Sequence, residues 1–298
     1  LLIQKVDLMQ PNPPGYVPDQ PQVVYTQQPG VYPPLDPSAD QFAQDAAITV
    51  QPGAVAVPAP PGTVIVPIPA PIEGVTPGLE YLTMVDTIFV QQMYDLLEVV
   101  ISWEVKNKYA LKNANGQQVY YAAEESGICM RQCCSSQRGF TMHIVDNFKR
   151  EVITITRPFK CCGGCFSCLA FCNCCANEVT IESPPGTVIG TVVQRTTCCS
   201  SGFYVRDASG TDIFTIAGPC CILLCGCQDK EFPVTAMNGD VIGAVTKKWG
   251  GCVREALTNA DIFSVTFPVD LDVKMKAILL GATFLIDFME FEQPKNNQ

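Results

Sequence analysis

The chain has 298 residues, and 47% of them are hydrophobic, which is enough for one or two domains with a sizeable core. Its formal net charge of -10 at pH 7 argues against general nucleic-acid binding, because such binding depends on basic surfaces. The chain begins at Leu1 without a methionine, so its natural start is left open. It shows neither a secretory signal nor an Asn-x-Ser/Thr sequon, and both absences favour a cytosolic location.

Residues 1–76 form a proline-rich tail in which Lys5 is the only basic residue. The tail has too few patterned hydrophobic residues to offset its ordering entropy, so we expect it to be disordered, with polyproline II character. Pro13, Pro14 and Tyr16 form a PPxY pattern, which WW domains bind in an aromatic-lined groove. Proline-rich chains also produce this pattern by chance, so a WW-domain partner is one of two interpretations.

A folded domain is expected from residue 77 to residue 292. Tyr81–Val100 has a mixed pattern that suits a short helix or strand, and short β-branched segments alternate with turns from Trp103 onward. Five turn pairs separate these segments: Asn115-Gly116, Asp146-Asn147, Pro185-Gly186, Ser209-Gly210 and Asn238-Gly239. Evenly spaced hairpins predict an antiparallel meander. Closure of that meander would remove its exposed edges, so we expect a mainly β fold, a closed antiparallel barrel of about 12 strands.

Cysteine is unusually frequent, with seventeen residues and many adjacent pairs. Without a secretion signal we expect reduced thiols rather than a disulfide framework. Seven of them form one cluster between two expected strands: Cys161, Cys162, Cys165, Cys168, Cys172, Cys174 and Cys175. The residues alone leave two interpretations open. Accessible thiols among apolar residues suit S-acylation with palmitate near a membrane, whereas the C-x2-C spacings suit a zinc or iron–sulfur site.

Val273–Phe291 is the one strongly apolar helix that the sequence predicts. Its uninterrupted apolar core, Ala277–Ile286, is ten residues long, whereas a membrane-spanning helix needs about twenty. A barrel of this size has an interior that strand side chains alone do not fill. We therefore expect this helix to lie at the centre of the barrel, with a membrane-spanning helix as the alternative.

Four polar residues of this helix fall within one stripe roughly 60° wide on an ideal helix. They are Lys276, Thr283, Asp287 and Glu290. Charges within a bilayer turn toward protein or water, whereas inside a barrel the stripe would meet polar strand groups. We therefore expect Asp287 to pair with a basic or hydroxyl group.

Several stretches together resemble the phospholipid scramblase family, whose fold is a tubby-like barrel. They are Pro77–Leu82, Leu96–Val99, Asn107–Tyr109, Tyr121–Glu124, Arg157-Pro158, the cysteine cluster, Pro184–Gly186, Arg254–Ala256, Phe267–Ala277 and Phe284–Phe288. The resemblance covers residues 77–292 and leaves 293–298 as a short C-terminal tail. In residues 1–76 the chain resembles the family only in being rich in proline.

The resemblance implies calcium-dependent, ATP-independent, bidirectional movement of phospholipids between the leaflets of the plasma membrane. It also implies S-acylation of the cysteine cluster and a barrel on the cytoplasmic face, with the C-terminal helix as a type II anchor. A segment similar to Gly243–Gly250 is linked to nuclear import, which would give a minor nuclear pool. An oligomer remains a possible further state.

The resemblance assigns calcium binding to an EF-hand-like segment just before the helix, and we expect that binding to be weak because the segment departs from the EF-hand pattern. The candidate ligands are Asn259, Asp261, Asp270 and Asp272. An EF-hand loop has Gly at its sixth position and Glu at its twelfth, where this chain has Ser264 and Asp270. The alternation of polar and apolar residues in 259–270 also suits a barrel strand, which is the competing interpretation.

No Ser/His/Asp arrangement, phosphate-binding loop or nucleophile elbow is visible in the sequence, so we do not expect an enzyme. Two functions remain. One is a phospholipid scramblase. The alternative is a signalling or adaptor barrel that acyl chains hold at the membrane and that recruits WW-domain proteins through its tail.

Overall fold

The structure is a computed structural model that describes residues 66, 69–93, 105–127, 134, 137–160, 175–197, 200–220, 228–249 and 261–292. All of these belong to one compact unit, Gly53–Gln298, and the other unit, Leu1–Pro52, lies outside the described residues. The expected disorder of the tail and the role of Pro13, Pro14 and Tyr16 therefore stay predictions.

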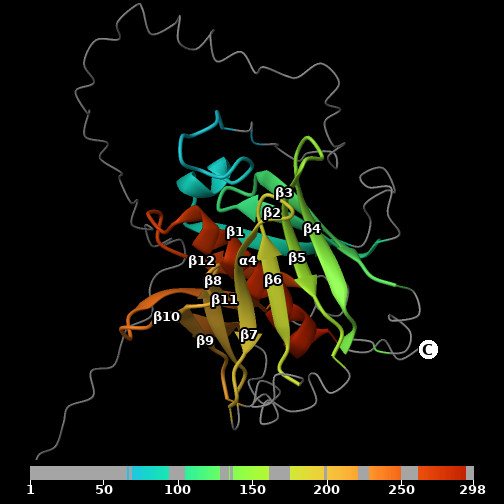
Figure 1. Ribbon diagram of the computed structural model, residues 1–298, viewed down its shortest axis with the longest axis vertical. Helices are drawn as coiled ribbons and strands as arrows, with labels where there is room; N and C mark the ends of the chain where they lie inside the picture. The colour runs from blue at the N-terminus through green and yellow to red at the C-terminus, as the bar shows by residue number, and fades with distance from the viewer. Residues whose placement is uncertain are drawn as a thin grey trace, which may run out of the picture. The chain divides into compact units, whose positions relative to one another are not determined.

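Twelve antiparallel strands form a closed barrel in the described region (Figure 1). They are β1 (Thr87–Met93), β2 (Val105–Asn113), β3 (Gln118–Glu125), β4 (Phe140–Asp146), β5 (Glu151–Arg157), β6 (Glu178–Glu182), β7 (Val188–Gln194), β8 (Gly202–Asp207), β9 (Asp212–Ala217), β10 (Lys230–Ala236), β11 (Val241–Lys248) and β12 (Ile262–Thr266). Each strand pairs with its neighbours in sequence, and β1 closes the ring against β12, with Ile88 opposite Val265. The predicted barrel of about twelve strands is confirmed.

The five predicted hairpin turns are all present. Four of them contain a glycine with positive φ, namely Gly116, Gly186, Gly210 and Gly239. Glycine enters this left-handed region without the strain that a Cβ would cause. In the fifth turn, Lys149 has a φ of 62°, and the Asp146 carboxylate accepts hydrogen bonds from the backbone N–H groups of Phe148 and Arg150. Local turn chemistry therefore sets the meander.

A short 3-10 helix, η1 (Glu80–Met84), precedes the first strand. Leu79 and Leu82 at this helix are fully buried, so η1 covers part of the core rather than extending from it. The predicted short helix or strand in Tyr81–Val100 thus corresponds to η1 followed by β1, and residues 94–100 lie outside the described residues.

The C-terminal helix begins at Asp272, whose carboxylate caps the first turn by accepting hydrogen bonds from the backbone N–H groups of Lys274 and Met275. It comprises α4 (Val273–Ile286) and a π-helical continuation, η5 (Asp287–Phe291). Every residue from Lys276 to Phe288 is buried. A helix that is buried on all sides needs a core around it.

Strands on several sides of the ring supply that core. Contacts between the helix and the strands include Gly281 with Ile181 of β6, Ile278 with Gly190 of β7, Phe284 with Tyr109 of β2, Phe288 with Phe140 of β4, and Phe291 with Phe263 of β12. The helix therefore fills the interior of the barrel, as expected from its short apolar core. Within the described ranges, no helix combines the length and apolar character that a bilayer crossing requires.

The two ends of the barrel differ. Because the strands alternate in direction, the five short connections β2–β3, β4–β5, β6–β7, β8–β9 and β10–β11 meet at one end, which we call the turn end. The other connections, of seven to twenty residues, meet at the opposite end, the loop end. The C-terminal helix enters at the turn end after β12 and finishes at the loop end.

A core substitution in α4 tests this arrangement. Leu280 is fully buried, so Leu280→Ala removes packing and leaves a cavity, which costs about 2–5 kcal/mol of unfolding free energy. Lys274→Ala, on the exposed first turn of the same helix, is the matched control and should stay within about 0.5 kcal/mol. Denaturant unfolding in detergent-free buffer measures both. Equal effects would contradict a helix packed inside the barrel.

Candidate functional site

All seventeen cysteines of the sequence lie between strands that are joined at the loop end. The predicted cluster belongs to the β5–β6 connection, and the rest belong to the β3–β4, β7–β8, β9–β10 and β11–β12 connections. Cys134 and Cys175 are half-buried and Cys220 is exposed, and the other cysteines lie outside the described residues. The sequence analysis missed this grouping because it requires the direction of each strand. Every cysteine therefore belongs, in sequence, to a connection that starts and finishes at the loop end.

The candidate calcium ligands do not gather around one point. Asp261 and Asp270 flank β12, and a five-residue strand separates its ends by roughly 16 Å, whereas calcium binds its oxygen ligands at about 2.3–2.6 Å. Asp261 pairs with Lys247 at 2.8 Å, and the Asp272 carboxylate caps α4. Asn259 lies outside the described residues. The segment is the strand of the competing interpretation, and the described ligands do not fit a single EF-hand-like ion.

The other metal prediction concerns the cysteine cluster. Among the described residues, no group of three or more His, Cys, Asp or Glu side chains is placed to hold a metal ion. Only Cys175 of the cluster is described, so the zinc alternative stays a prediction.

Lys276 is fully buried near the turn end of the helix. Its ammonium group donates hydrogen bonds to the carbonyl oxygens of Leu82, Val85 and Val269 at 2.8, 2.9 and 2.7 Å. Burial lowers the pKa of this amine, while Asp270 and Asp86 act in the opposite direction. Three donors meet three acceptors, so Lys276 fastens the helix start to η1 and to the connection after β12.

Asp287 is buried where the α-helix gives way to the π-helix. The Tyr109 hydroxyl of β2 donates a hydrogen bond of 2.8 Å to its Oδ2, which confirms the predicted pairing with a hydroxyl group. Burial raises the pKa of this carboxyl to about 7, with Asp261 adding to the effect and the Tyr109 hydrogen bond opposing it. Burial likewise raises the pKa of Tyr109 well above its usual value. The pair is a protonatable centre inside the loop end of the barrel.

The four residues of the predicted stripe do not line one wall. Thr283 donates to the Leu279 carbonyl of its own helix at 3.0 Å, and Glu290 accepts a hydrogen bond from the Ser201 hydroxyl just before β8. Strands β2 and β8, which hold the partners of Asp287 and Glu290, are six places apart in the ring of twelve. The expectation of one continuous stripe is therefore wrong for the last turn. The hydrogen bond from Glu292 N to Asp287 O spans five residues, and this wider turn rotates Glu290 away.

An ionic network that the sequence analysis did not identify holds the end of the helix. Arg138 is fully buried and donates to both carboxylate oxygens of Glu124 on β3 at 2.6 and 2.8 Å. Arg138 also donates a hydrogen bond to the Glu292 carboxylate at 2.9 Å. Asn107 of β2 adds a hydrogen bond to Glu124 at 2.7 Å. No local pattern marks Arg138, because its partners are 14 and 154 residues away in sequence.

Both lysines of the segment that the resemblance links to nuclear import form ion pairs. Lys247 pairs with Asp261 and its Nζ lies 4.1 Å from the centre of the Phe291 ring, while Lys248 pairs with Asp229 at 2.9 Å. These contacts serve the packing of β11 against the helix end. A role in nuclear import stays a prediction.

The free energy of unfolding should depend on pH through Asp287. A carboxyl whose pKa is raised from 3.8 to about 7 binds its proton more tightly in the folded state, so stability should fall as pH rises between these two values. Asp287→Asn still accepts the Tyr109 hydrogen bond, and it should reduce this slope and stabilise the protein above pH 7 by at most roughly 4 kcal/mol. Urea unfolding at several pH values measures the change.

The turn variant Asp240→Asn is the control and should keep the wild-type slope, because Asp240 is exposed at the opposite end of the barrel. An unchanged slope in Asp287→Asn would contradict the assignment of the buried proton to this carboxyl.

Comparison with known proteins shows which family this chain belongs to. A family model described as Scramblase matches residues 66–293. Phospholipid scramblase 1 of Rattus norvegicus is 42% identical over 271 residues, which is 91% of this chain and 77% of the relative. Phospholipid scramblase family member 5 of Homo sapiens is 43% identical over 224 residues, 74% of this chain and 80% of the relative. Phospholipid scramblase 4 of Homo sapiens is 35% identical over 286 residues, 95% of this chain and 84% of the relative.

No solved structure matches the chain. The family match nevertheless covers every described strand and the central helix, and the sequence similarity extends across most of the chain and most of each relative. The chain belongs to the phospholipid scramblase family.

Proposed function

We propose that this protein moves phospholipids between the two leaflets of a membrane, in both directions, without ATP and under the control of calcium. The observation that carries the proposal is the family match over residues 66–293, together with relatives that are named phospholipid scramblases. Lipid movement down a gradient needs no catalytic residue, so the protein would act as a transporter rather than an enzyme.

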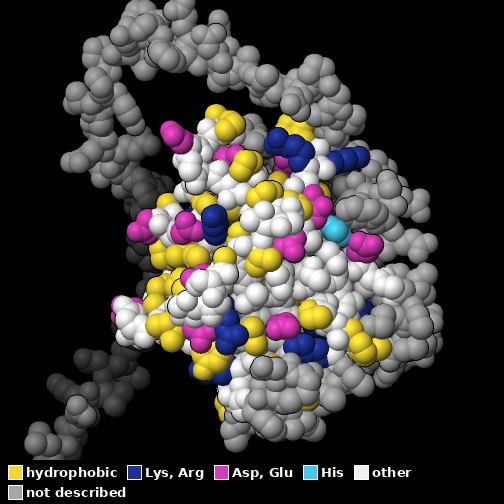
Figure 2. Space-filling model, in the orientation of Figure 1, with side chains coloured by type: hydrophobic (Ala, Val, Ile, Leu, Met, Phe, Trp, Pro, Cys, Tyr) yellow, Lys and Arg dark blue, Asp and Glu magenta, His cyan; other side chains and the backbone are white. Residues whose placement is uncertain are grey.

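The filled barrel limits where lipid could move. Side chains of α4 occupy the interior, and the fully buried Leu280 and Phe284 leave no room there for a phospholipid headgroup. On the face in Figure 2, basic and acidic side chains are interspersed with hydrophobic ones, so that face is not a uniformly apolar belt. We therefore place lipid exchange at a surface of the barrel and not along its axis.

The loop end is the surface that we propose to face the membrane. The connections at this end carry all seventeen cysteines, and several acyl chains anchor a protein stably where one gives only marginal binding. Phe159 and Trp249, next to two of these connections, are exposed. Multiple palmitate chains there would hold the barrel against the cytoplasmic side of the plasma membrane.

Because β12 separates Asp261 from Asp270, calcium would act through an arrangement other than a single loop over residues 259–270. The filled barrel favours a second candidate function, the acyl-anchored adaptor that recruits WW-domain proteins through its tail, since an adaptor needs no path for a headgroup.

Reconstitution into liposomes separates the two candidates. We expect the purified full chain to expose fluorescent phospholipid from the inner leaflet to an external quencher, in the absence of ATP and faster with calcium than with a chelator. Protein-free liposomes and heat-denatured protein are the controls. Lipid movement no faster than in these controls would contradict the transport proposal and favour the adaptor.

The same assay tests the calcium ligands. Because β12 separates the two carboxylates, we expect Asp261→Ala to leave calcium stimulation within about twofold of wild type, as does the surface control Asp229→Ala. Loss of stimulation in both Asp261→Ala and Asp270→Ala, but not in Asp229→Ala, would restore the single-site interpretation.

A further inference from the structure

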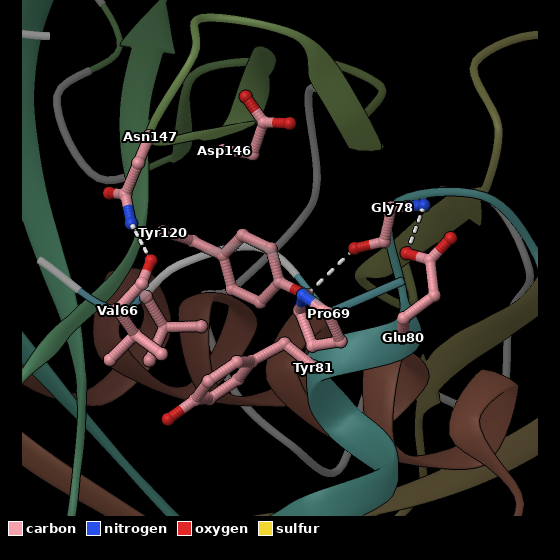
Figure 3. A pocket seen from close by; sticks show the side chains of 9 residues that line it. Val66, Pro69, Gly78, Glu80, Tyr81, Tyr120, Asp146 and Asn147 are labelled. Atoms are coloured by element: carbon pink, nitrogen blue, oxygen red, sulfur yellow. Dashed lines mark hydrogen bonds between the residues drawn. The ribbon is translucent and has the colours of Figure 1, made fainter. Parts of the chain in front are cut away.

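Val66 and Pro69, the first and last residues of the proline-alternating sequence Val66-Pro67-Ile68-Pro69, contact the barrel at its turn end. The backbone N–H of Val66 donates to the Gln118 carbonyl at 3.3 Å. The Asn147 side-chain amide donates to the Val66 carbonyl at 3.3 Å (Figure 3). Both backbone groups of Val66 are therefore bound by the barrel, and its side chain packs against the core.

Pro69, at the other end of this segment, lines an aromatic pocket. Tyr81 and Tyr120 line the same pocket, and Figure 3 shows their rings on either side of the pocket. The rings meet edge to face with their centroids 6.4 Å apart. The cavity that these residues line is about 10 Å³, roughly the room for one water.

The pocket is held in shape by contacts that do not involve the proline segment. The Tyr120 hydroxyl donates to the Gly78 carbonyl at 2.7 Å, and the Asn113 amide donates to the Tyr81 hydroxyl at 2.7 Å. Asn147 is 3% exposed and also donates to the Gln118 carbonyl at 3.2 Å. A site whose rings and donor are already fixed loses little conformational freedom when a ligand binds.

These features match the chemistry of polyproline recognition. A polyproline II helix has no internal hydrogen bonds, so its carbonyl oxygens are available to a side-chain donor, and its proline rings pack on aromatic faces. Here Asn147 supplies the donor, and Tyr81 and Tyr120 supply the aromatic faces.

The sequence contains a second segment of the same pattern. Val57-Pro58-Ala59-Pro60 repeats the V-P-x-P of Val66-Pro67-Ile68-Pro69 at a distance of nine residues. The described contacts of the later copy are made by Val66 and Pro69, and Val57 and Pro60 stand at the corresponding positions of the earlier copy.

We propose that the Tyr81–Tyr120 pocket is a polyproline-binding site that takes V-P-x-P segments of this chain. Val66–Pro69 is its resident ligand, and Val57–Pro60 competes for the same place. Exchange of one copy for the other moves the tail by nine residues, about 28 Å of extended polyproline II chain. The site would thereby set how far the proline-rich tail reaches from the barrel, independently of lipid movement.

The covalent link gives each copy a high effective concentration at the pocket, so an added peptide must compete with both. The test therefore uses four full-length proteins: wild type, Pro67→Ala/Pro69→Ala, Pro58→Ala/Pro60→Ala, and the variant with all four changes. The probe is a fluorescent peptide of residues 55–62, followed by anisotropy, and its control replaces both prolines of the motif by alanine.

We expect the fourfold variant to bind the peptide at least tenfold more tightly than wild type, with the Pro67→Ala/Pro69→Ala protein in between. Adding Asn147→Ala to the fourfold variant should weaken binding about tenfold, whereas Asn238→Ala, in the β10–β11 turn at the same end, should not. Equal binding by all four proteins, or equal binding of the alanine peptide, would overturn the proposal.

A second measurement does not depend on the folding of the fourfold variant. In the otherwise wild-type chain, Asn147→Ala should increase hydrogen exchange at the Val66 amide at least tenfold, with Leu111 and Ile153 as internal reporters of the intact barrel. Unchanged exchange at Val66 would also overturn the proposal, and a parallel rise at the reporter amides would show that the whole barrel, not the pocket, holds the segment.

Discussion

The need to fill a twelve-stranded barrel governs the rest of this structure. A barrel of twelve strands encloses more space than the strand side chains fill, and α4 occupies the rest of that space. Because that helix is buried on every side, each polar group on it needs a partner inside the barrel. Lys276 uses three carbonyls and Asp287 uses Tyr109. The polar contacts thus fix the position of a helix whose apolar surface alone would allow sliding.

The same construction makes the two ends of the barrel different. At the turn end, tight hairpins surround the capped start of the helix and the pocket that holds Pro69. The loop end, where the longer connections start and finish, holds Asp287, Glu290 and the Arg138 network. The connections that contain the cysteines start and finish at this second end, whereas Val66 is bound at the first. That division suits both candidate functions.

The sequence predicted what depends on local chemistry. Turn pairs such as Asn115-Gly116 marked the hairpins, and the short apolar core of Ala277–Ile286 indicated a helix inside the barrel. Features that depend on distant partners were not predictable. The π-helical turn at Asp287 follows from the positions of Tyr109 and Ser201 on strands far apart in the ring, and Arg138 meets Glu124 only after β3 and β4 pair. The separation of Asp261 from Asp270 by β12 likewise depends on the barrel and could not be foreseen from their spacing in the sequence, and calcium binding stays a prediction.

The central claim is that α4 remains the core of the barrel when the protein is at a membrane. A single tryptophan at Phe284, with Trp103 and Trp249 replaced by phenylalanine, tests it in vesicles whose lipids carry bromine near the middle of the acyl chains. Phe284 is fully buried beside Tyr109, so the account predicts blue-shifted fluorescence that these lipids do not quench. Strong quenching by the brominated lipids would show the helix in the bilayer and would contradict the account.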